Sequence, residues 1–119
     1  MSDTRLFETP PGVRLIDLAA LPAGAARGFV LQMRAGRFHG FVVRTAQGVQ
    51  GYVDRCPHAG LPLVRTLDAY LTPDGTLIQC AWHAALFRIE DGLCVGGPCT
   101  GQRLTPWPVR IAGDAVLTA

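Results

Sequence analysis

Glycine and proline residues divide this sequence into short segments, and this pattern limits the elements that the chain can build. The sequence contains 14 Gly and 9 Pro. The segments between them carry apolar or β-branched residues and end in turn residues, which is typical of strands. We expect eight strands, at Val13–Asp17, Gly28–Met33, Phe38–Thr45, Val49–Asp54, Thr76–Gln79, Ala85–Ile89, Pro108–Ile111 and Ala115–Thr118.

Turn signals join several of these strands directly. Ala46-Gln47-Gly48 has the length of a hairpin turn, and Asp91-Gly92 and Gly113-Asp114 are further hairpin pairs. Helical spacing is limited to about one turn within Leu15–Leu21 and another within Leu63–Leu71. The sequence therefore predicts an all-β protein of antiparallel strands, arranged as a sandwich or a barrel.

Length and composition bound the protein class. A chain of 119 residues predicts one domain over residues 1–119, and 49% hydrophobic with 17% charged residues excludes disorder. The longest run without Asp, Glu, Lys or Arg is the 13 residues from Gly75 to Phe87, which is too short to span a bilayer. The first residues show no export signal, so we expect a cytoplasmic protein.

Charge and cysteine content indicate a metal or redox role. The net charge is +2, and the 11 basic residues are all Arg and form no cluster, which argues against a nucleic-acid partner. Four Cys in a chain without an export signal argue against a disulfide framework. The composition therefore favours a small metalloprotein.

Two short motifs carry the candidate ligands. The first is Cys56-Pro57-His58, and the second is Cys80-Ala81-Trp82-His83. Each motif places one thiol and one imidazole in a turn at the end of a strand. Residues i and i+2 of an extended segment face the same way, so Cys56 and His58 can address one ligand.

Two Cys and two His can bind zinc or a two-iron, two-sulfide cluster. Zinc sites commonly pair Cys with Cys and His with His, whereas here each loop supplies one of each. A binuclear cluster with two Cys on one iron and two His on the other suits this mixed arrangement. The all-Cys plant-type pattern fails, because Gln102 stands where the Cys after Cys94 and Cys99 is needed.

At these motifs the sequence resembles the Rieske family, over roughly Val13 to Ile111. The resemblance implies one [2Fe-2S] cluster of Rieske type, with Cys56 and Cys80 on the inner iron and His58 and His83 on the outer iron. It also implies an antiparallel Rieske-type fold of stacked sheets or an incomplete barrel, with two cluster-binding loops at one end. The segment Gly96-Gly97-Pro98 resembles the family's third loop, which covers the cluster.

The sequence departs from the family pattern at three places. The 21 residues between His58 and Cys80 exceed the usual spacing, with the excess expected in Thr66–Gly75. Ala84 stands where Gly commonly follows the second His, and Ala81 where Pro is common.

The remaining candidate residues have simpler interpretations. We expect His39 to be structural within its strand, and Cys94 and Cys99 to be small, half-buried residues near the third loop. A disulfide between them is disfavoured in a reducing cytosol. Trp82 is either a packing residue or part of an apolar docking tip with Leu61, Pro62 and Pro98.

We expect no catalytic site in this chain. A catalytic iron needs two His and a carboxylate, and after two of the three His are assigned to the cluster only His39 remains. High-potential family members carry cysteines at the positions of Leu61 and Trp82, and hydroxyls at those of Ala85 and Phe87. Hydrogen bonds to sulfur raise the potential, so their absence predicts the low end of the Rieske range, roughly −150 mV.

The sequence therefore predicts an electron carrier rather than an enzyme. The resemblance implies a soluble ferredoxin that passes single electrons from a flavin-dependent ferredoxin reductase to a terminal oxygenase. Two alternatives remain: a small Rieske-like subunit of a larger reductase, of the nitrite reductase type, and a structural zinc module with a Cys2His2 site.

Overall fold

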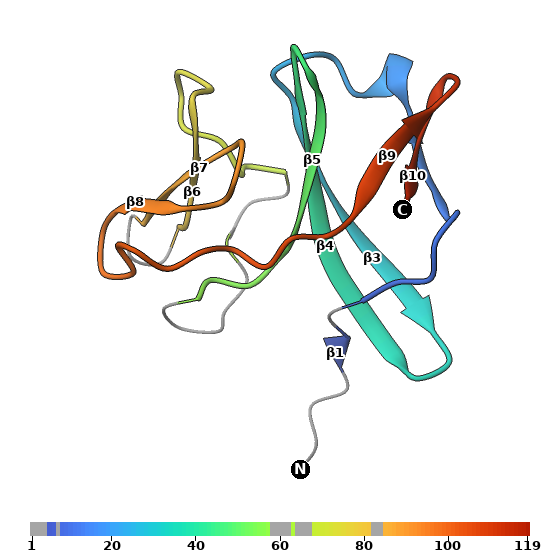
Figure 1. The fold of residues 1–119 in the computed structure, drawn as a ribbon, viewed down its shortest axis with the longest axis horizontal. Coiled ribbons are helices and arrows are strands. Elements are labelled where there is room, and N and C mark those ends of the chain that lie inside the picture. The colour runs from blue at the N-terminus through green and yellow to red at the C-terminus, as the bar shows by residue number, and fades with distance from the viewer. Residues whose placement is uncertain (1–4, 7, 58–62, 64–67, 82–84) are drawn as a thin grey trace.

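Nearly all of the regular structure in this protein is β-strand. The computed structural model describes residues 5–6, 8–57, 63, 68–81 and 85–119. Among them, one short 3-10 helix, η1 (Leu18–Ala20), interrupts a succession of strands (Figure 1). No helix in the described ranges is long and apolar enough to cross a membrane.

The longest strands form a central sheet around β4 (Gly36–Thr45). Its antiparallel neighbours are β3 (Ala26–Met33) and β5 (Gly48–Val53). The two-residue strand β1 (Arg5–Leu6) pairs with β4 in parallel. Thr45 pairs with Gly48 across a tight hairpin turn, as the predicted turn at Ala46-Gln47-Gly48 requires.

Two smaller antiparallel sheets lie on opposite sides of the central strands in Figure 1. One has the order β2-β10-β9, with bounds Arg14–Asp17, Ala115–Thr118 and Val109–Ala112. The other has the order β6-β7-β8, with bounds Leu77–Gln79, Leu86–Arg88 and Cys94–Gly96. The described sheets are stacked and do not close into a barrel.

The middle of β4 is buried on both faces, each in its own apolar cluster. Phe38 and Val42 of β4 pack in the cluster that includes Val116 of β10. Phe41 and Val43 pack in a second cluster, which includes residues of the β6-β7-β8 sheet. A strand that is covered on both sides carries apolar residues without alternation, and this explains the run Phe41-Val42-Val43.

Trp107 closes the first of these clusters and depends on a glycine opposite it. Its side chain is buried, its ring lies 4.6 Å from the ring of Phe38, and its indole nitrogen donates a hydrogen bond to Thr9 Oγ1 (2.9 Å). A Cβ atom on Gly40 would lie 2.6 Å from both rings. Gly40 is therefore the residue that lets the tryptophan pack against the sheet.

The structure confirms the predicted fold class and adds two strands to it. All eight expected strands are present with boundary shifts of a few residues, and the helical spacing at Leu15–Leu21 corresponds to η1. The strands β1 and β8 were not predicted, because a strand of two or three residues is too short to carry a periodic signal. The helical turn expected within Leu63–Leu71 falls partly outside the described residues, and Leu71 itself forms a β-bridge with Ile78.

Candidate metal centre

Cys56 is positioned by the turn that follows β5. The backbone nitrogen of Asp54 donates to the carbonyl of His39 (2.9 Å), and that of Arg55 donates to the carbonyl of Val53 (2.8 Å). These bonds hold the chain against the central sheet just before the cysteine. The Cys56 side chain is fully buried, with 0% of its surface exposed.

Cys80 is positioned by the end of β6. Its backbone nitrogen donates to the carbonyl of Ala85 (2.9 Å), so the two ends of the second motif loop are held together. The next nitrogen, of Ala81, donates to the carbonyl of Leu63 (2.7 Å), which lies after the first motif. This bond joins the two motif loops, and the Cys80 side chain is 1% exposed.

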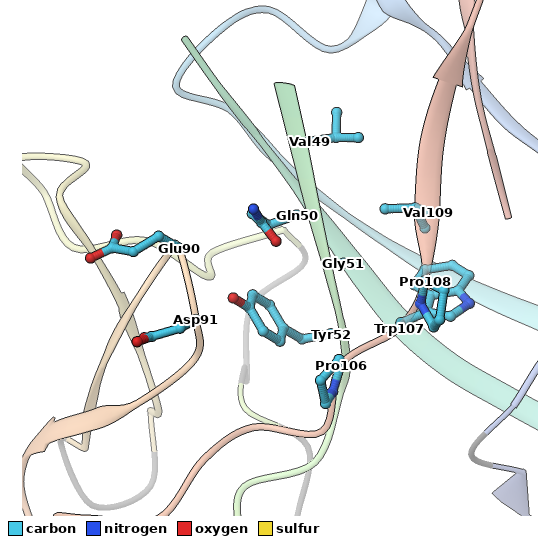
Figure 2. Close-up of a pocket in the computed structure, with 10 residues that line it drawn as sticks. All are labelled: Val49, Gln50, Gly51, Tyr52, Glu90, Asp91, Pro106, Trp107, Pro108 and Val109. Carbon is cyan, nitrogen blue, oxygen red and sulfur yellow. The ribbon is translucent and has the colours of Figure 1, made fainter. Parts of the chain in front are cut away.

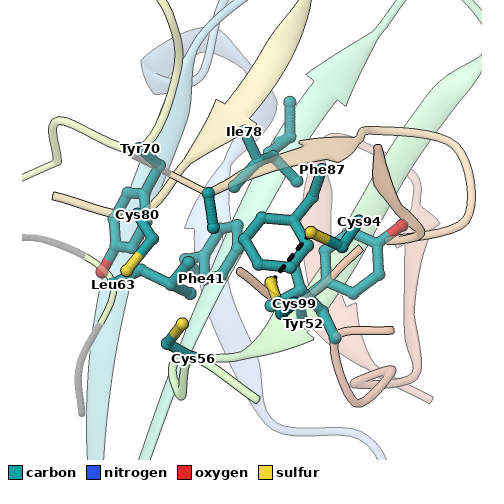
Figure 3. Close-up of a cluster of buried hydrophobic side chains, with 13 residues drawn as sticks. Phe41, Tyr52, Cys56, Leu63, Tyr70, Ile78, Cys80, Phe87, Cys94 and Cys99 are labelled. Carbon is teal, nitrogen blue, oxygen red and sulfur yellow. Dashed lines mark hydrogen bonds between the residues drawn. The ribbon is translucent and has the colours of Figure 1, made fainter. Parts of the chain in front are cut away.

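The two cysteines share one end of a buried apolar cluster. Figure 3 shows their sulfur atoms on the same side of Phe41, near Leu63. Burial disfavours a bare thiolate, whereas a metal ion stabilises the deprotonated thiol that binds it. Two buried thiols at the ends of adjoining loops therefore fit the inner side of a metal or iron–sulfur site.

The third loop packs directly on the second. Gly97 has a positive φ of 90°, and a Cβ atom there would lie 2.8 Å from the Cα atom of Ala85. Only glycine combines this conformation with such a close approach. Pro98, next in the chain, is exposed, as expected for a residue at the tip of this loop.

A carboxylate that the sequence analysis did not single out ties the first loop to the core. Asp54 is 7% exposed, and its Oδ1 accepts a hydrogen bond from the backbone nitrogen of Leu63 (2.8 Å). Its Oδ2 accepts a hydrogen bond from the Tyr70 hydroxyl (2.8 Å). The Tyr70 ring stacks on Phe41 with ring centroids 4.2 Å apart.

The segment that exceeds the family spacing supplies this tyrosine. Asp68 anchors the segment, because its Oδ1 accepts a hydrogen bond from the Gly28 nitrogen (2.8 Å) and its Oδ2 lies 3.4 Å from Arg27 Nε. Gly28 leaves room for the tyrosine, since a Cβ atom there would lie 2.5 Å from the Tyr70 hydroxyl. Burial, followed by the charge of Asp54, raises the pKa of Tyr70 far above its usual range, so the hydroxyl remains a donor.

The structure brings together Cys56 and Cys80 of the predicted ligand set. The predicted ligands His58 and His83, and the docking candidates Leu61, Pro62 and Trp82, lie outside the described residues.

His39 is half-buried within β4, where it pairs with Val30 of β3. The sequence analysis did not identify Tyr70 as a residue that supports the site. The long spacing between His58 and Cys80 was the available signal, but the length of a loop does not reveal which of its side chains is buried.

Cys94 and Cys99 differ from the expectation of half-buried residues. Both are 1% exposed, because they belong to the same apolar cluster as Cys56 and Cys80. Their side chains contact each other at the opposite end of that cluster in Figure 3.

A pocket of about 210 Å³ lies elsewhere, between β5, the start of β9 and the turn after β7. In Figure 2, Glu90 and Asp91 line one side of it and Tyr52 and Gln50 the other. The Arg88 guanidinium, together with a backbone hydrogen bond from Leu93, lowers the pKa of Asp91 to about 2. None of the cysteines lines this pocket, so it is separate from the candidate metal centre.

The fold and the site define a small all-β protein with two buried cysteines on neighbouring loops. The family model of the Rieske [2Fe-2S] domain matches residues 19–111. The chain therefore belongs to the Rieske [2Fe-2S] domain family. A Rieske-type cluster is the cofactor of this family, and the buried cysteines fit it.

Solved structures with the same fold include components of carbazole 1,9a-dioxygenase. The ferredoxin of carbazole 1,9a-dioxygenase from Nocardioides aromaticivorans IC177 is 22% identical, with a TM-score of 0.68, and the match covers 93% of this chain and 98% of that one. A chain in the complex of reduced oxygenase and oxidised ferredoxin in carbazole 1,9a-dioxygenase is 24% identical, with a TM-score of 0.68, and the match covers 90% of this chain and 91% of that one.

A larger protein also contains this fold. The terminal oxygenase of carbazole 1,9a-dioxygenase from Novosphingobium sp. KA1 is 21% identical, with a TM-score of 0.70 over 94% of this chain. The match covers 29% of the oxygenase chain. A search of the curated proteins finds no match to this sequence.

The contact between Tyr70 and Asp54 gives a first prediction. We expect Tyr70→Phe to lower the free energy of unfolding by about 1–3 kcal/mol, because a buried carboxylate oxygen loses its donor. We also expect faster loss of bound iron, because Asp54 holds Leu63 and Leu63 holds Ala81. Urea denaturation and the rate of iron release to a chelator measure the two effects.

Tyr52→Phe is the matched control, because the Tyr52 hydroxyl donates to the carbonyl of Ile89 in the same cluster but away from both motif loops. It should lower stability by about 1 kcal/mol and leave iron release unchanged. Equal iron release from Tyr70→Phe and Tyr52→Phe would show that Tyr70 acts only on global stability.

Proposed function

We propose that this protein is a one-electron carrier of an oxygenase system, with a low-potential Rieske [2Fe-2S] cluster. When bound, the cluster supplies a centre that accepts and donates single electrons. The observation that supports the proposal best is the pair of buried cysteines, Cys56 and Cys80, on loops joined through Leu63 and Ala81 in a member of the Rieske family.

The proposed ligand set is Cys56 and Cys80 on the inner iron with His58 and His83 on the outer iron. In this arrangement the two thiolates lie within the protein and the imidazoles lead toward its surface. Apolar burial around Cys56 and Cys80 keeps water away from the sulfur atoms. The histidine side is then the proposed exit for electrons.

The chain's own residues favour a low potential. Ala85 and Phe87 are both fully buried, at 0% exposure, and neither carries a hydroxyl. The sites that donate hydrogen bonds to sulfur in high-potential members are thus occupied here by a methyl group and a phenyl ring. Without those donors, the more negative, reduced state gains less stabilisation.

The proposed partners are a flavin-dependent ferredoxin reductase as donor and a terminal oxygenase as acceptor. Structures of ferredoxin and oxygenase complexes among the similar folds support an oxygenase as the partner class. The identity of 22–24% to the ferredoxins supports no choice of oxygenase substrate. The exposed Pro98 of the third loop is the described part of the proposed docking tip.

For residues 1–119 we propose no catalytic iron and no catalytic residue. A catalytic iron of the two-His, one-carboxylate type needs a second histidine beside His39 once His58 and His83 hold the cluster. His39 is also built into the middle of β4, and its carbonyl accepts the hydrogen bond that positions Asp54.

Removal of any one proposed ligand tests the ligand set. We expect Cys56→Ser, Cys80→Ser, His58→Ala and His83→Ala each to lose most of the bound iron and the EPR signal of the reduced protein, because each removes a bond to the cluster. Iron and acid-labile sulfide analysis, with low-temperature EPR, measures the loss. His39→Ala is the control and should retain the cluster. Full iron retention in His83→Ala would show that the ligand set is wrong.

Adding a hydroxyl beside the cysteines tests the proposed low potential. We expect Ala85→Ser to raise the midpoint potential by about 30 mV or more, equivalent to about 0.7 kcal/mol in a one-electron couple, because serine adds a donor near sulfur. Ala115→Ser is the matched control, since Ala115 is also buried but lies in β10, away from both motifs. Spectroelectrochemical titration measures both variants. Equal potentials in Ala85→Ser, Ala115→Ser and the parent protein would place residue 85 away from the cluster.

A further inference from the structure

Cys94 and Cys99 form a contact between two thiols inside the third loop. The Cys99 Sγ donates a hydrogen bond to the Cys94 Sγ at 2.8 Å, and the Cys94 Sγ donates to the carbonyl of Gly96 (3.1 Å). Both cysteines are free. Two sulfur atoms this close need to move by less than about 1 Å to reach the length of a disulfide bond, about 2.05 Å.

The loop around the pair is fixed by its own hydrogen bonds. The Gly101 nitrogen donates to the carbonyl of Cys94 (3.1 Å), and the Gln102 nitrogen donates to that of Cys99 (2.8 Å). The Cys94 nitrogen in turn donates to the carbonyl of Gln102 (2.8 Å). These bonds hold both cysteine backbones and therefore preset the approach of the two sulfur atoms.

The pair lies just beneath the surface. Cys94 and Cys99 are buried, but Pro98 and Thr100 on either side of Cys99 are exposed. A small oxidant can therefore reach the sulfur atoms by a small movement of the turn at Pro98 and Thr100. A protein thiol or a bulky disulfide is too large to reach them. Burial, followed by the hydrogen bond to Cys94, raises the pKa of the Cys99 thiol, so Cys99 remains the protonated donor of the pair.

We propose that Cys94 and Cys99 are a peroxide-sensitive dithiol that closes to a disulfide within the third loop. This site differs from the disulfide of high-potential Rieske proteins, whose positions correspond to Leu61 and Trp82. The proposal does not depend on the electron-carrier function. Cys94 and Cys99 belong to the same apolar cluster as Cys56, so the oxidation state of the pair changes the surroundings of a proposed cluster ligand.

The chemistry balances with hydrogen peroxide as the oxidant. The Cys94 sulfur, which accepts a hydrogen bond from Cys99, gives up its proton to solvent and attacks one peroxide oxygen as the thiolate. A sulfur–oxygen bond forms as the oxygen–oxygen bond breaks, and the departing hydroxide takes up a proton to become water. The Cys99 sulfur then displaces the oxygen from Cys94 as a second water, which also carries away the Cys99 proton. Two thiols and one peroxide thus give one disulfide and two waters.

Arginine positions allow a direct test by peptide mapping. Cleavage after Arg places Cys94 and Cys99 together in the peptide 89–103, with Cys56 in 56–65 and Cys80 in 66–88. The holoprotein is treated with one equivalent of hydrogen peroxide, denatured, alkylated and digested. We expect the peptide 89–103 to be unalkylated and lighter by two hydrogen atoms, and dithiothreitol added before alkylation to restore two alkylated cysteines.

Single serine variants provide the controls. Cys94→Ser and Cys99→Ser should each give a peptide 89–103 without the loss of two hydrogen atoms, since one sulfur remains. Two alkylated cysteines in the peptide 89–103 after peroxide treatment of the parent protein would overturn the proposal. A disulfide that joins this peptide to 56–65 or 66–88, or oxidation of both sulfurs to sulfinic acid, would equally overturn it.

Discussion

The hydrogen bonds that connect Asp54, Leu63 and Ala81 are the contacts on which the rest of the site depends. Asp54 extends from the end of the central sheet and holds the Leu63 nitrogen, while the Leu63 carbonyl holds the Ala81 nitrogen. Through these two bonds, the loop after Cys56 and the loop after Cys80 are fixed to each other. Strands alone would place the two cysteines at the ends of different sheets, since β5 and β6 do not pair.

Burial of Cys56 and Cys80 suits them to bind a metal ion. Cys56 and Cys80 belong to an apolar cluster, so a metal ion bound to their sulfur atoms would lie at the edge of the core and away from water. The same cluster encloses Cys94 and Cys99, which contact each other. One apolar core thus supports both the proposed cluster ligands and the proposed dithiol, and the packing of Gly97 on Ala85 joins the two regions.

The strands of the fold and the two motif loops of the site could be predicted from the sequence. Turn residues such as Asp91-Gly92 mark strand ends, and the Cys-x-His and Cys-x-x-His spacings identify the motif loops. The continuous apolar run at Phe41–Val43 is typical of a strand covered on both faces, but the sequence analysis predicted only the strand and not its burial. Side-chain contacts between distant segments were not predictable. The Asp54–Tyr70 hydrogen bond spans a loop of unusual length, and the Cys94–Cys99 contact depends on a β8 strand too short to show a period.

Mössbauer spectroscopy of iron-57-enriched protein shows whether two thiolates and two imidazoles divide between two irons. We expect two iron sites with different parameters, and on reduction the added electron localised on the iron with nitrogen ligands. Two equivalent irons with sulfur ligands, or a protein that contains one zinc and no iron, would contradict it.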